Sequence, residues 1–285
     1  MRGPLGFFRI TGSELRRMFA RPRTYLGYAA FFLFNVLFLL LMSRPGPSRL
    51  FRLPLERAGY LFEDYFSALT LAYSMVALTT VFLATLFFPL VAGDIVAKEV
   101  EDGNLRLLLS RPVSRFHLLL SKFIACQLYT VTLVLFIGLI SLVTGGFLAR
   151  WNGGLFAFAP ERGLFATFPF AAGLVRFALA LLCVAASMGT VTSVAFFFSC
   201  QRMKPAAATI LTVCLFFIDA IFSRVPYFAE YEDWFLTSRM AAWLDAFRER
   251  VPVHELLQNY AILAGISLTC FVLGWAVFER RDLKA

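Results

Sequence analysis

The sequence predicts an all-α, polytopic membrane protein, on the basis of its composition, its long uncharged runs and the placement of its basic residues. Hydrophobic residues fill 60% of the 285 positions, charged residues fill 16%, and phenylalanine alone occurs 34 times. A soluble domain has only about 45–50% apolar residues. We therefore expect most of the chain to lie in a lipid bilayer.

Six stretches are long and apolar enough to cross that bilayer, whose core of about 30 Å needs about 20 helical residues. Five carry no charged residue, and the stretch between Arg202–Lys204 and Arg224 is interrupted only by Asp219. The predicted spans cover residues 24–43, 66–92, 123–148, 177–200, 205–223 and 257–278. Residues 1–285 are expected to form one transmembrane domain. Because the first apolar run begins only after residue 23, no cleavable signal sequence is expected.

Basic residues predict the orientation of the spans. With the N-terminus in the cytoplasm, all four lysines fall on the cytoplasmic side: Lys98, Lys122, Lys204 and Lys284. The protein is thus expected in the cell inner membrane with both ends cytoplasmic. We expect the basic residues behind the net charge of +9 to attract the cytoplasmic segments to an anionic lipid leaflet. No nucleic-acid partner is expected.

Three segments outside the spans show amphipathic patterns. In Leu5–Arg23, apolar residues share one helical face, so an N-terminal interfacial helix ending before Pro22 is expected. In the cytoplasmic loop 94–122, we expect a short amphipathic helix, with a bend allowed at Gly103–Asn104, before a break at Arg111–Pro112. A second helix is expected to follow the break and to enter the third span near Lys122. In residues 224–255, helical spacing predicts an outer helix that lies on the membrane or folds back towards the spans. The predicted outer aromatic anchors are Trp234 and Trp243.

Small residues recur at four-residue spacing in the fourth span, at Ala185, Gly189 and Ser193. Such a stripe allows two helix backbones to approach closely. It predicts either a contact within the chain or a contact with a second copy.

The residues needed for familiar chemistry are mostly missing from the sequence. No Gly-Lys dipeptide occurs, so the chain has no phosphate loop for ATP. The five cysteines and two histidines show no metal-ligand spacing, and neither histidine lies in a membrane core. We expect no catalytic residue, no metal and no cofactor bound by this chain. Asp219, the one acid within a span, is the candidate transport-path residue, although an interfacial position or a partner would also explain it.

Residues 93–122 resemble the first cytoplasmic loop of ABC transporter permeases of the type-2 exporter family. The matching residues are Glu99, Gly103, Leu107 to Leu109, Pro112, Ser114, Arg115 and Lys122. Two positions depart from the family pattern, Asn104 and Ser121. The segments Glu14–Arg23 and Phe278–Leu283 resemble the N-terminal helix and the usual ending of that family.

The resemblance implies a permease subunit of an ATP-driven exporter, in which a separate ABC ATPase subunit binds Mg-ATP. It also implies pairing with a second permease as a homodimer or a heterodimer, and a coupling helix in the cytoplasmic loop. The expected ATPase-coupling residues are Glu99, Glu101, Gly103, Leu107, Pro112 and Arg115. This subunit is then not itself an enzyme, and the transported substrate is not encoded in these motifs.

Two other classes of function compete with the export permease. One is an intramembrane enzyme or a scaffold for assembling another membrane complex. The other is a channel or an ion-coupled secondary transporter, for which more titratable groups within the spans would be expected.

Overall fold

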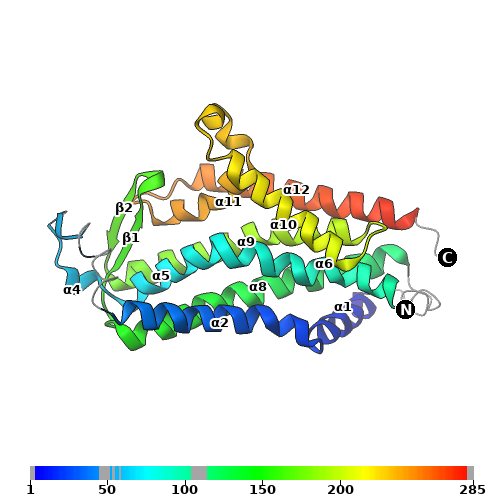
Figure 1. Ribbon diagram of the computed structural model, residues 1–285, viewed down its shortest axis with the longest axis horizontal. Helices are drawn as coiled ribbons and strands as arrows, with labels where there is room; N and C mark the ends of the chain where they lie inside the picture. Colours follow the sequence, from blue (N-terminus) through cyan, green and yellow to red (C-terminus); the bar gives the residue numbers. More distant parts are fainter. Residues whose placement is uncertain (1–3, 45–51, 53–54, 58, 104–113, 281–285) are drawn as a thin grey trace.

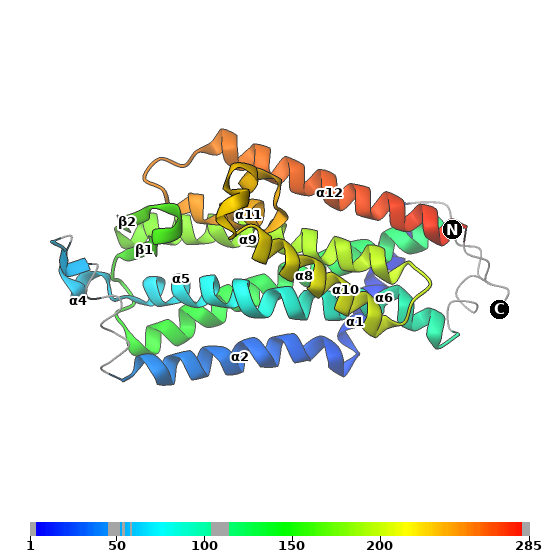
Figure 2. The same cartoon turned by 45° about the horizontal axis from the view of Figure 1, so that its top comes forward.

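The structure is a computed structural model that describes residues 4–44, 52, 55–57, 59–103 and 114–280. Its long helices run side by side along one axis, with α1 and the last turns of α12 at the same end (Figures 1 and 2). In chain order the elements are α1 (Pro4–Phe19), α2 (Pro22–Met42), α4 (Phe62–Tyr65), α5 (Ala68–Thr79), η1 (Thr80–Ala84), α6 (Thr85–Glu101), α8 (Arg115–Leu148), β1 (Leu155–Ala159), η2 (Pro160–Arg162), β2 (Leu164–Phe168), α9 (Phe170–Ser199), α10 (Pro205–Phe222), η3 (Pro226–Trp234), α11 (Leu236–Met240), η4 (Ala241–Phe247) and α12 (Val253–Glu279).

Five helices of the described chain are long and apolar enough to cross a membrane: α2, α8, α9, α10 and α12. They coincide with five of the six predicted spans. Helix α8 has 34 residues, about 51 Å at 1.5 Å per residue, and so exceeds a bilayer core of about 30 Å. The chain is therefore an all-α, multi-pass membrane protein.

The predicted span 66–92 folds as three helical segments that follow one another without a gap. Helix α5 passes into η1, a single π-helical turn, and η1 passes into α6. The Ser67 side chain caps α5 by accepting the Thr70 N–H at 3.2 Å. Because the π-turn divides this helix, neither part alone has the length of a span.

Helices extend into the loop predicted over residues 94–122 from both sides. Residues 94–101 are the last turns of α6 rather than the start of a separate amphipathic helix, and α8 begins at Arg115, as expected for a helix that enters the third span. Gly103 has φ +70°, a left-handed conformation that suits glycine after a helix end, which confirms the predicted bend. The predicted break at Arg111–Pro112 lies outside the described residues.

The N-terminal helix predicted over Leu5–Arg23 is present as α1, but most of its apolar face contacts protein. Met18 is buried in the core, and Leu15 and Phe19 pack against the same core. Only Phe8 of that face is strongly exposed, at 71%. Pro22 begins α2 rather than merely ending α1, as suits proline in a first helical turn.

The opposite end of the bundle carries an antiparallel hairpin that the sequence pattern did not predict. Strands β1 and β2 pair from Leu155 opposite Phe168 to Ala159 opposite Leu164. The hairpin is fixed to α5, because the Thr70 hydroxyl accepts the Phe156 N–H at 2.9 Å. Figure 1 shows it beside α4, far from α1.

The outer segment 224–255 folds back towards the spans, one of the two predicted outcomes. It forms η3, α11 and η4 rather than a single helix. Trp243 is buried against Tyr73, with 6.1 Å between the ring centroids, so its predicted role as an interfacial anchor is wrong. Trp234, in contrast, is exposed.

The small-residue stripe of α9 contacts α8 within the same chain. The Gln127 side chain of α8 donates to the Gly189 carbonyl at 3.2 Å and to the Ser193 hydroxyl at 2.8 Å. One turn along, the hydroxyls of Thr130 and Thr192 lie 2.7 Å apart. These contacts favour the internal interpretation of the stripe, since hydrogen bonds between helices stabilise packing within lipid.

Candidate functional site

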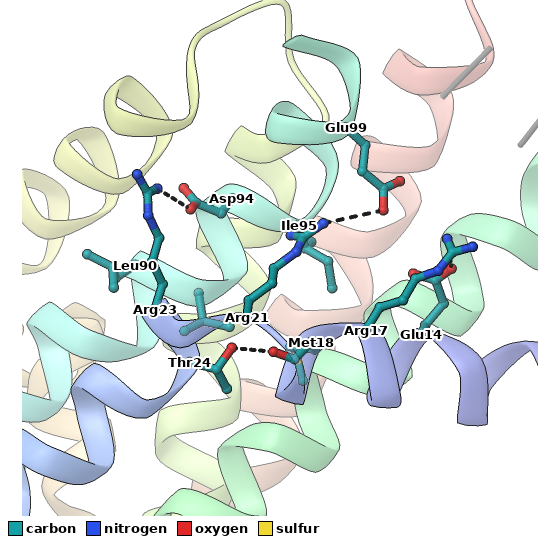
Figure 3. Close-up of a pocket in the computed structure, with 11 residues that line it drawn as sticks. Glu14, Arg17, Met18, Arg21, Arg23, Thr24, Leu90, Asp94, Ile95 and Glu99 are labelled. Atoms are coloured by element: carbon teal, nitrogen blue, oxygen red, sulfur yellow. Dashed lines mark hydrogen bonds and ion pairs between the residues drawn. The ribbon is translucent and has the colours of Figure 1, made fainter. Parts of the chain in front are cut away.

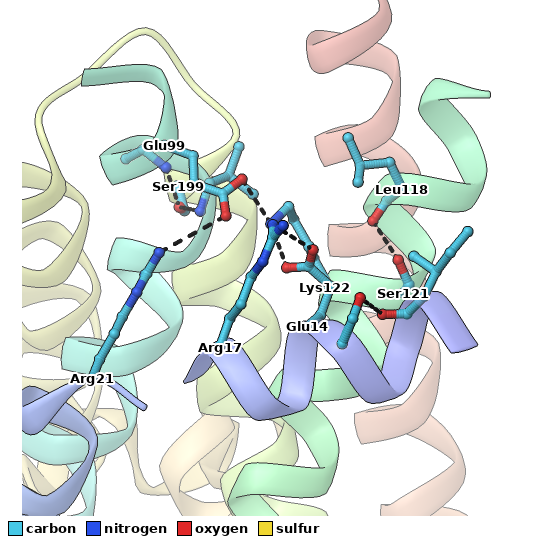
Figure 4. Close-up of polar contacts among 12 residues, drawn as sticks. Glu14, Arg17, Arg21, Glu99, Leu118, Ser121, Lys122 and Ser199 are labelled. Atoms are coloured by element: carbon cyan, nitrogen blue, oxygen red, sulfur yellow. Dashed lines mark hydrogen bonds and ion pairs between the residues drawn. The ribbon is translucent and has the colours of Figure 1, made fainter. Parts of the chain in front are cut away.

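Three charged side chains from three helices meet at the end of the bundle that holds α1 (Figure 4). Lys122 Nζ of α8 donates a hydrogen bond to Glu14 Oε2 of α1 at 2.7 Å. The same nitrogen lies 2.7 Å from Glu99 Oε2 of α6. The Lys122 side chain is only 1% exposed, and both carboxylate side chains are 5% exposed. We call Glu14, Glu99 and Lys122 the Lys122 cluster.

Two arginines cover the Lys122 cluster on its more exposed side. Arg17 Nη1 lies 3.4 Å from Glu14 Oε1, and Arg21 Nη2 lies 3.8 Å from Glu99 Oε1. Each carboxylate thus has a lysine on its inner side and an arginine on its outer side. The inner contacts dominate, because exposed ion pairs are screened by solvent.

The helices place these side chains for local reasons. Ser114 caps α8, with its Oγ accepting the His117 N–H at 3.3 Å, and Lys122 follows two turns later. Glu14 lies one turn before Met18, on the face of α1 that packs against the bundle. Near Glu99, the Ser199 hydroxyl of α9 accepts the N–H groups of Val96 and Ala97 at 3.1 and 3.0 Å.

A small cavity lies beside the Lys122 cluster, between α1, α2 and α6 (Figure 3). Its volume is about 20 Å³, which is room for about one water molecule. Arg23 closes one side by pairing with Asp94 at 2.8 Å. At the corner between α1 and α2, the Thr24 hydroxyl donates to the Met18 carbonyl.

The arrangement acts as a mechanical tie between helix ends. Burying a charge is expensive, and an ion pair offsets that cost only when its geometry is good. Here Lys122 Nζ donates a hydrogen bond to Glu14 Oε2 and lies 2.7 Å from Glu99 Oε2, an oxygen that has no hydrogen-bond partner within the described part of the chain. The cluster therefore links α1, α6 and α8 through one hydrogen bond and through charge attraction. Within the described ranges, no group of three His, Cys, Asp or Glu side chains could hold a metal ion.

The predicted coupling residues occupy different positions around this tie. Glu99 lies inside the Lys122 cluster, whereas Glu101 is exposed as the last residue of α6. Arg115 begins α8 and donates from Nη1 to the Glu279 carbonyl of α12 at 3.0 Å. Leu107 and Pro112 lie outside the described residues.

Asp219, the candidate transport-path residue, holds the start of α11. Its carboxylate accepts the Leu236 N–H at 3.2 Å and the Thr237 N–H at 2.7 Å. It also accepts the Thr237 hydroxyl at 2.6 Å. These bonds give Asp219 the role of a capping side chain supplied from another helix.

Sequence reasoning did not identify Glu14 and Lys122 as partners. The sequence places Lys122 just before the third predicted span and Glu14 as the one acid among the basic residues of 1–23. One signal was available: Glu14 shares a helical face with Met18, so an acid stood on the apolar side of α1. Which base would meet it depends on tertiary packing.

The fold and its charged end define a class, a multi-pass helical membrane protein with helix ends joined by buried charges. A family model described as a protein of unknown function (DUF2705) matches residues 32–284, and the chain belongs to that family. A relative from Bacillus subtilis (strain 168), the uncharacterized protein YhcI, is 44% identical over 71 residues. That match covers 22% of this chain and 23% of the relative.

Proposed function

We propose that the chain is the permease subunit of an ATP-driven exporter, moved by a separate nucleotide-binding subunit. The observation that carries the proposal is the Lys122 cluster, which joins α6 and α8 on either side of the connection 102–114. A force applied to that connection reaches α6, α8 and α1 together, because buried ion pairs resist separation. The chain has no phosphate loop of its own, so the energy comes from a partner.

The proposed topology has six spans, with both ends in the cytoplasm of the inner membrane. The remaining span is formed by α5, η1 and α6 together, from Ala68 to Glu101, whose 34 residues extend about 51 Å at 1.5 Å per residue. Lysines 98, 122 and 204 then lie on the cytoplasmic side, as the positive-inside rule requires. Helix α1 lies at the cytoplasmic interface, with Arg9 and Arg16 exposed towards the anionic headgroups.

The structure suggests different tasks for the two glutamates at the end of α6. Glu99 positions the helix through Lys122, whereas Glu101 is exposed and free of the Lys122 cluster. Glu101 is therefore the better candidate to meet a basic group of the ATPase. A charge reversal at Glu99 would break the buried cluster, so a loss of ATPase binding could then come from lost stability rather than from a lost docking contact.

Asp219 does not favour the ion-coupled alternative. A carboxylate that carries protons or ions must be able to exchange its partners during transport. The Asp219 carboxylate instead accepts three hydrogen bonds from Leu236 and Thr237.

Affinity purification tests the proposal. The tagged chain, extracted from its native membrane, should recover a soluble protein that contains a phosphate loop, identified by mass spectrometry. Glu101→Lys should lower that recovery, because it reverses an exposed charge at the proposed docking surface. Glu230→Lys, the same reversal on exposed η3, is the matched control and should not. Recovery of the chain without any nucleotide-binding protein would overturn the proposed function.

A further inference from the structure

The long helix from Ala68 to Glu101 carries two adjacent interruptions of its hydrogen-bond pattern. At η1, five residues form a π-turn, in which bonds run from residue i to i+5 instead of i+4. Five residues after η1 ends, Pro89 lies inside α6 and offers no N–H to the carbonyl one turn before it. π-turns and prolines are the usual causes of sharp kinks in helices.

Hydroxyl groups bond to backbone carbonyls on the N-terminal side of this interruption. Thr79 Oγ1 donates to the Met75 carbonyl at 2.7 Å, and Thr80 Oγ1 donates to the Val76 carbonyl at 2.7 Å. Thr209 of α10 reaches the Pro89 carbonyl at 3.4 Å. Threonine hydroxyls that bond back to the carbonyl four residues earlier often bend a helix. Two such bonds lie directly beside the π-turn, where they favour a bend.

The two halves of the helix are attached to different parts of the molecule. Helix α5 is held by the far end of the bundle, where Ser67 Oγ donates to the Gly154 carbonyl at 2.7 Å. The Tyr73 ring of α5 packs edge-on against Phe247, with 4.9 Å between centroids. Helix α6 is held at its other end through Glu99 and Lys122. The interruption lies between these two attachments (Figure 2).

We propose that residues 80–89 form a hinge, about which α6 tilts while α5 stays fixed to the hairpin and η4. This inference deepens the proposed function, since it names the point at which motion from the cytoplasmic end enters the membrane. Hinges of this kind absorb a rotation in a few residues and leave the flanking elements rigid. Because Lys122 belongs to α8 and Glu14 to α1, a tilt of α6 would pull on both helices through the Lys122 cluster.

Deletion of one residue tests the hinge directly. A π-turn holds one residue more than an α-turn, so deleting Leu83 converts it to regular α-helix without rotating the residues that follow. The measurement is amide hydrogen exchange of the chain in nanodiscs. In the natural protein, amides of residues 80–88 should exchange at least about tenfold faster than those in the middle of α9, because they open locally. The deletion should remove most of that difference.

Two controls keep the result interpretable. Deleting Ala186 from α9, a continuous α-helix with Ala186 on its exposed side, should prevent folding, because every later residue turns by about 100°. Pro89→Ala restores one backbone donor without changing the length, and it should slow exchange of the same amides even if the deletion variant fails to fold. The hinge is ruled out if the amides of this segment exchange as slowly as those of α9, or if neither change alters their exchange.

The exchange measurement needs no partner protein, so it separates the two proposals. Failure to find an ATPase would remove the proposed function and leave a measured hinge in place. A rigid helix in a chain that binds an ATPase would remove the hinge alone.

Discussion

At the scale of single residues, Lys122 is the centre of the buried charge cluster. Its ammonium group is buried between two carboxylates at 2.7 Å, and each of the three charges is tolerated only because the others are there. Removing one member of such a group leaves an uncompensated buried charge, which costs more than the intact group contributes.

Lys122→Met should therefore destabilise the protein strongly. We expect a loss of about 3–5 kcal/mol, measured as a lower apparent melting temperature in detergent. The variant that also carries Glu14→Gln and Glu99→Gln should recover much of that loss, since it buries no unpaired charge. An unchanged melting temperature in the single variant would contradict the cluster.

Asp219 makes a smaller and more local contribution. Asp219→Ala should free the start of α11 at a cost of about 1 kcal/mol, because two backbone N–H groups lose their acceptor. Limited proteolysis should then cut residues 224–247 faster. The control is Glu232→Ala, which removes the same charge from an exposed position. Equal cleavage of both variants would show that Asp219 does not hold this segment.

For these residues, the sequence identified the side chains but not their partners. Glu99, Gly103 and Asp219 were singled out by pattern, and the bend at Gly103 is confirmed by its φ of +70°. The partners of Glu99 and Asp219 were not predicted, because Lys122 and Thr237 meet them only through the packing of separate helices. Leu107 and Pro112 lie outside the described residues, so their coupling role remains a prediction.

At the scale of elements, close contacts between helices depend on glycine at a few positions. A Cβ atom at Gly145 of α8 would lie 2.7 Å from the Ala68 carbonyl oxygen of α5. That oxygen belongs to the backbone, so it cannot move aside as a flexible side chain would. Gly265 of α12 has no such neighbour within 4 Å.

Gly145→Ala and Gly265→Ala should therefore have opposite effects on stability. The first should cost about 1–3 kcal/mol by overpacking, whereas the second should gain up to about 1 kcal/mol, since alanine suits a helix interior better than glycine. Paired melting curves in the same detergent measure both. A neutral Gly145→Ala would mean that α5 and α8 pack less closely than described.

The presence of the long helices was easier to predict than the residues at which they begin and end. Charge-free runs located α2, α8, α9 and α12, and a run interrupted only by Asp219 located α10, because hydrophobic length is a direct requirement of the bilayer. Helix α6 continues to Glu101, past the predicted span end at residue 92, and its charged residues Asp94 and Glu99 have ion-pair partners on other helices. The hairpin was missed because its ten strand residues lie in an apolar stretch without clear alternation.

At the scale of the whole molecule, the proposed sixth span has a direct test. Glu63 lies in α4 shortly before α5, and Glu101 is the last residue of α6; both are exposed, and they flank the proposed span on opposite sides. With the native cysteines replaced, Glu63→Cys should react with an impermeant maleimide added outside the cell, and Glu101→Cys should react only after lysis. Labelling of both from one side would show that this helix does not cross the bilayer.

The central claim is that a separate ATPase drives this chain from the end that holds the Lys122 cluster. The most direct measurement is Mg-ATP hydrolysis by the complex purified through a tag on this chain and reconstituted in nanodiscs. The account predicts hydrolysis well above a mock purification, and a lower rate for Glu101→Lys at equal recovery of the chain. A monodisperse wild-type preparation whose ATP hydrolysis stays at the mock level would contradict it.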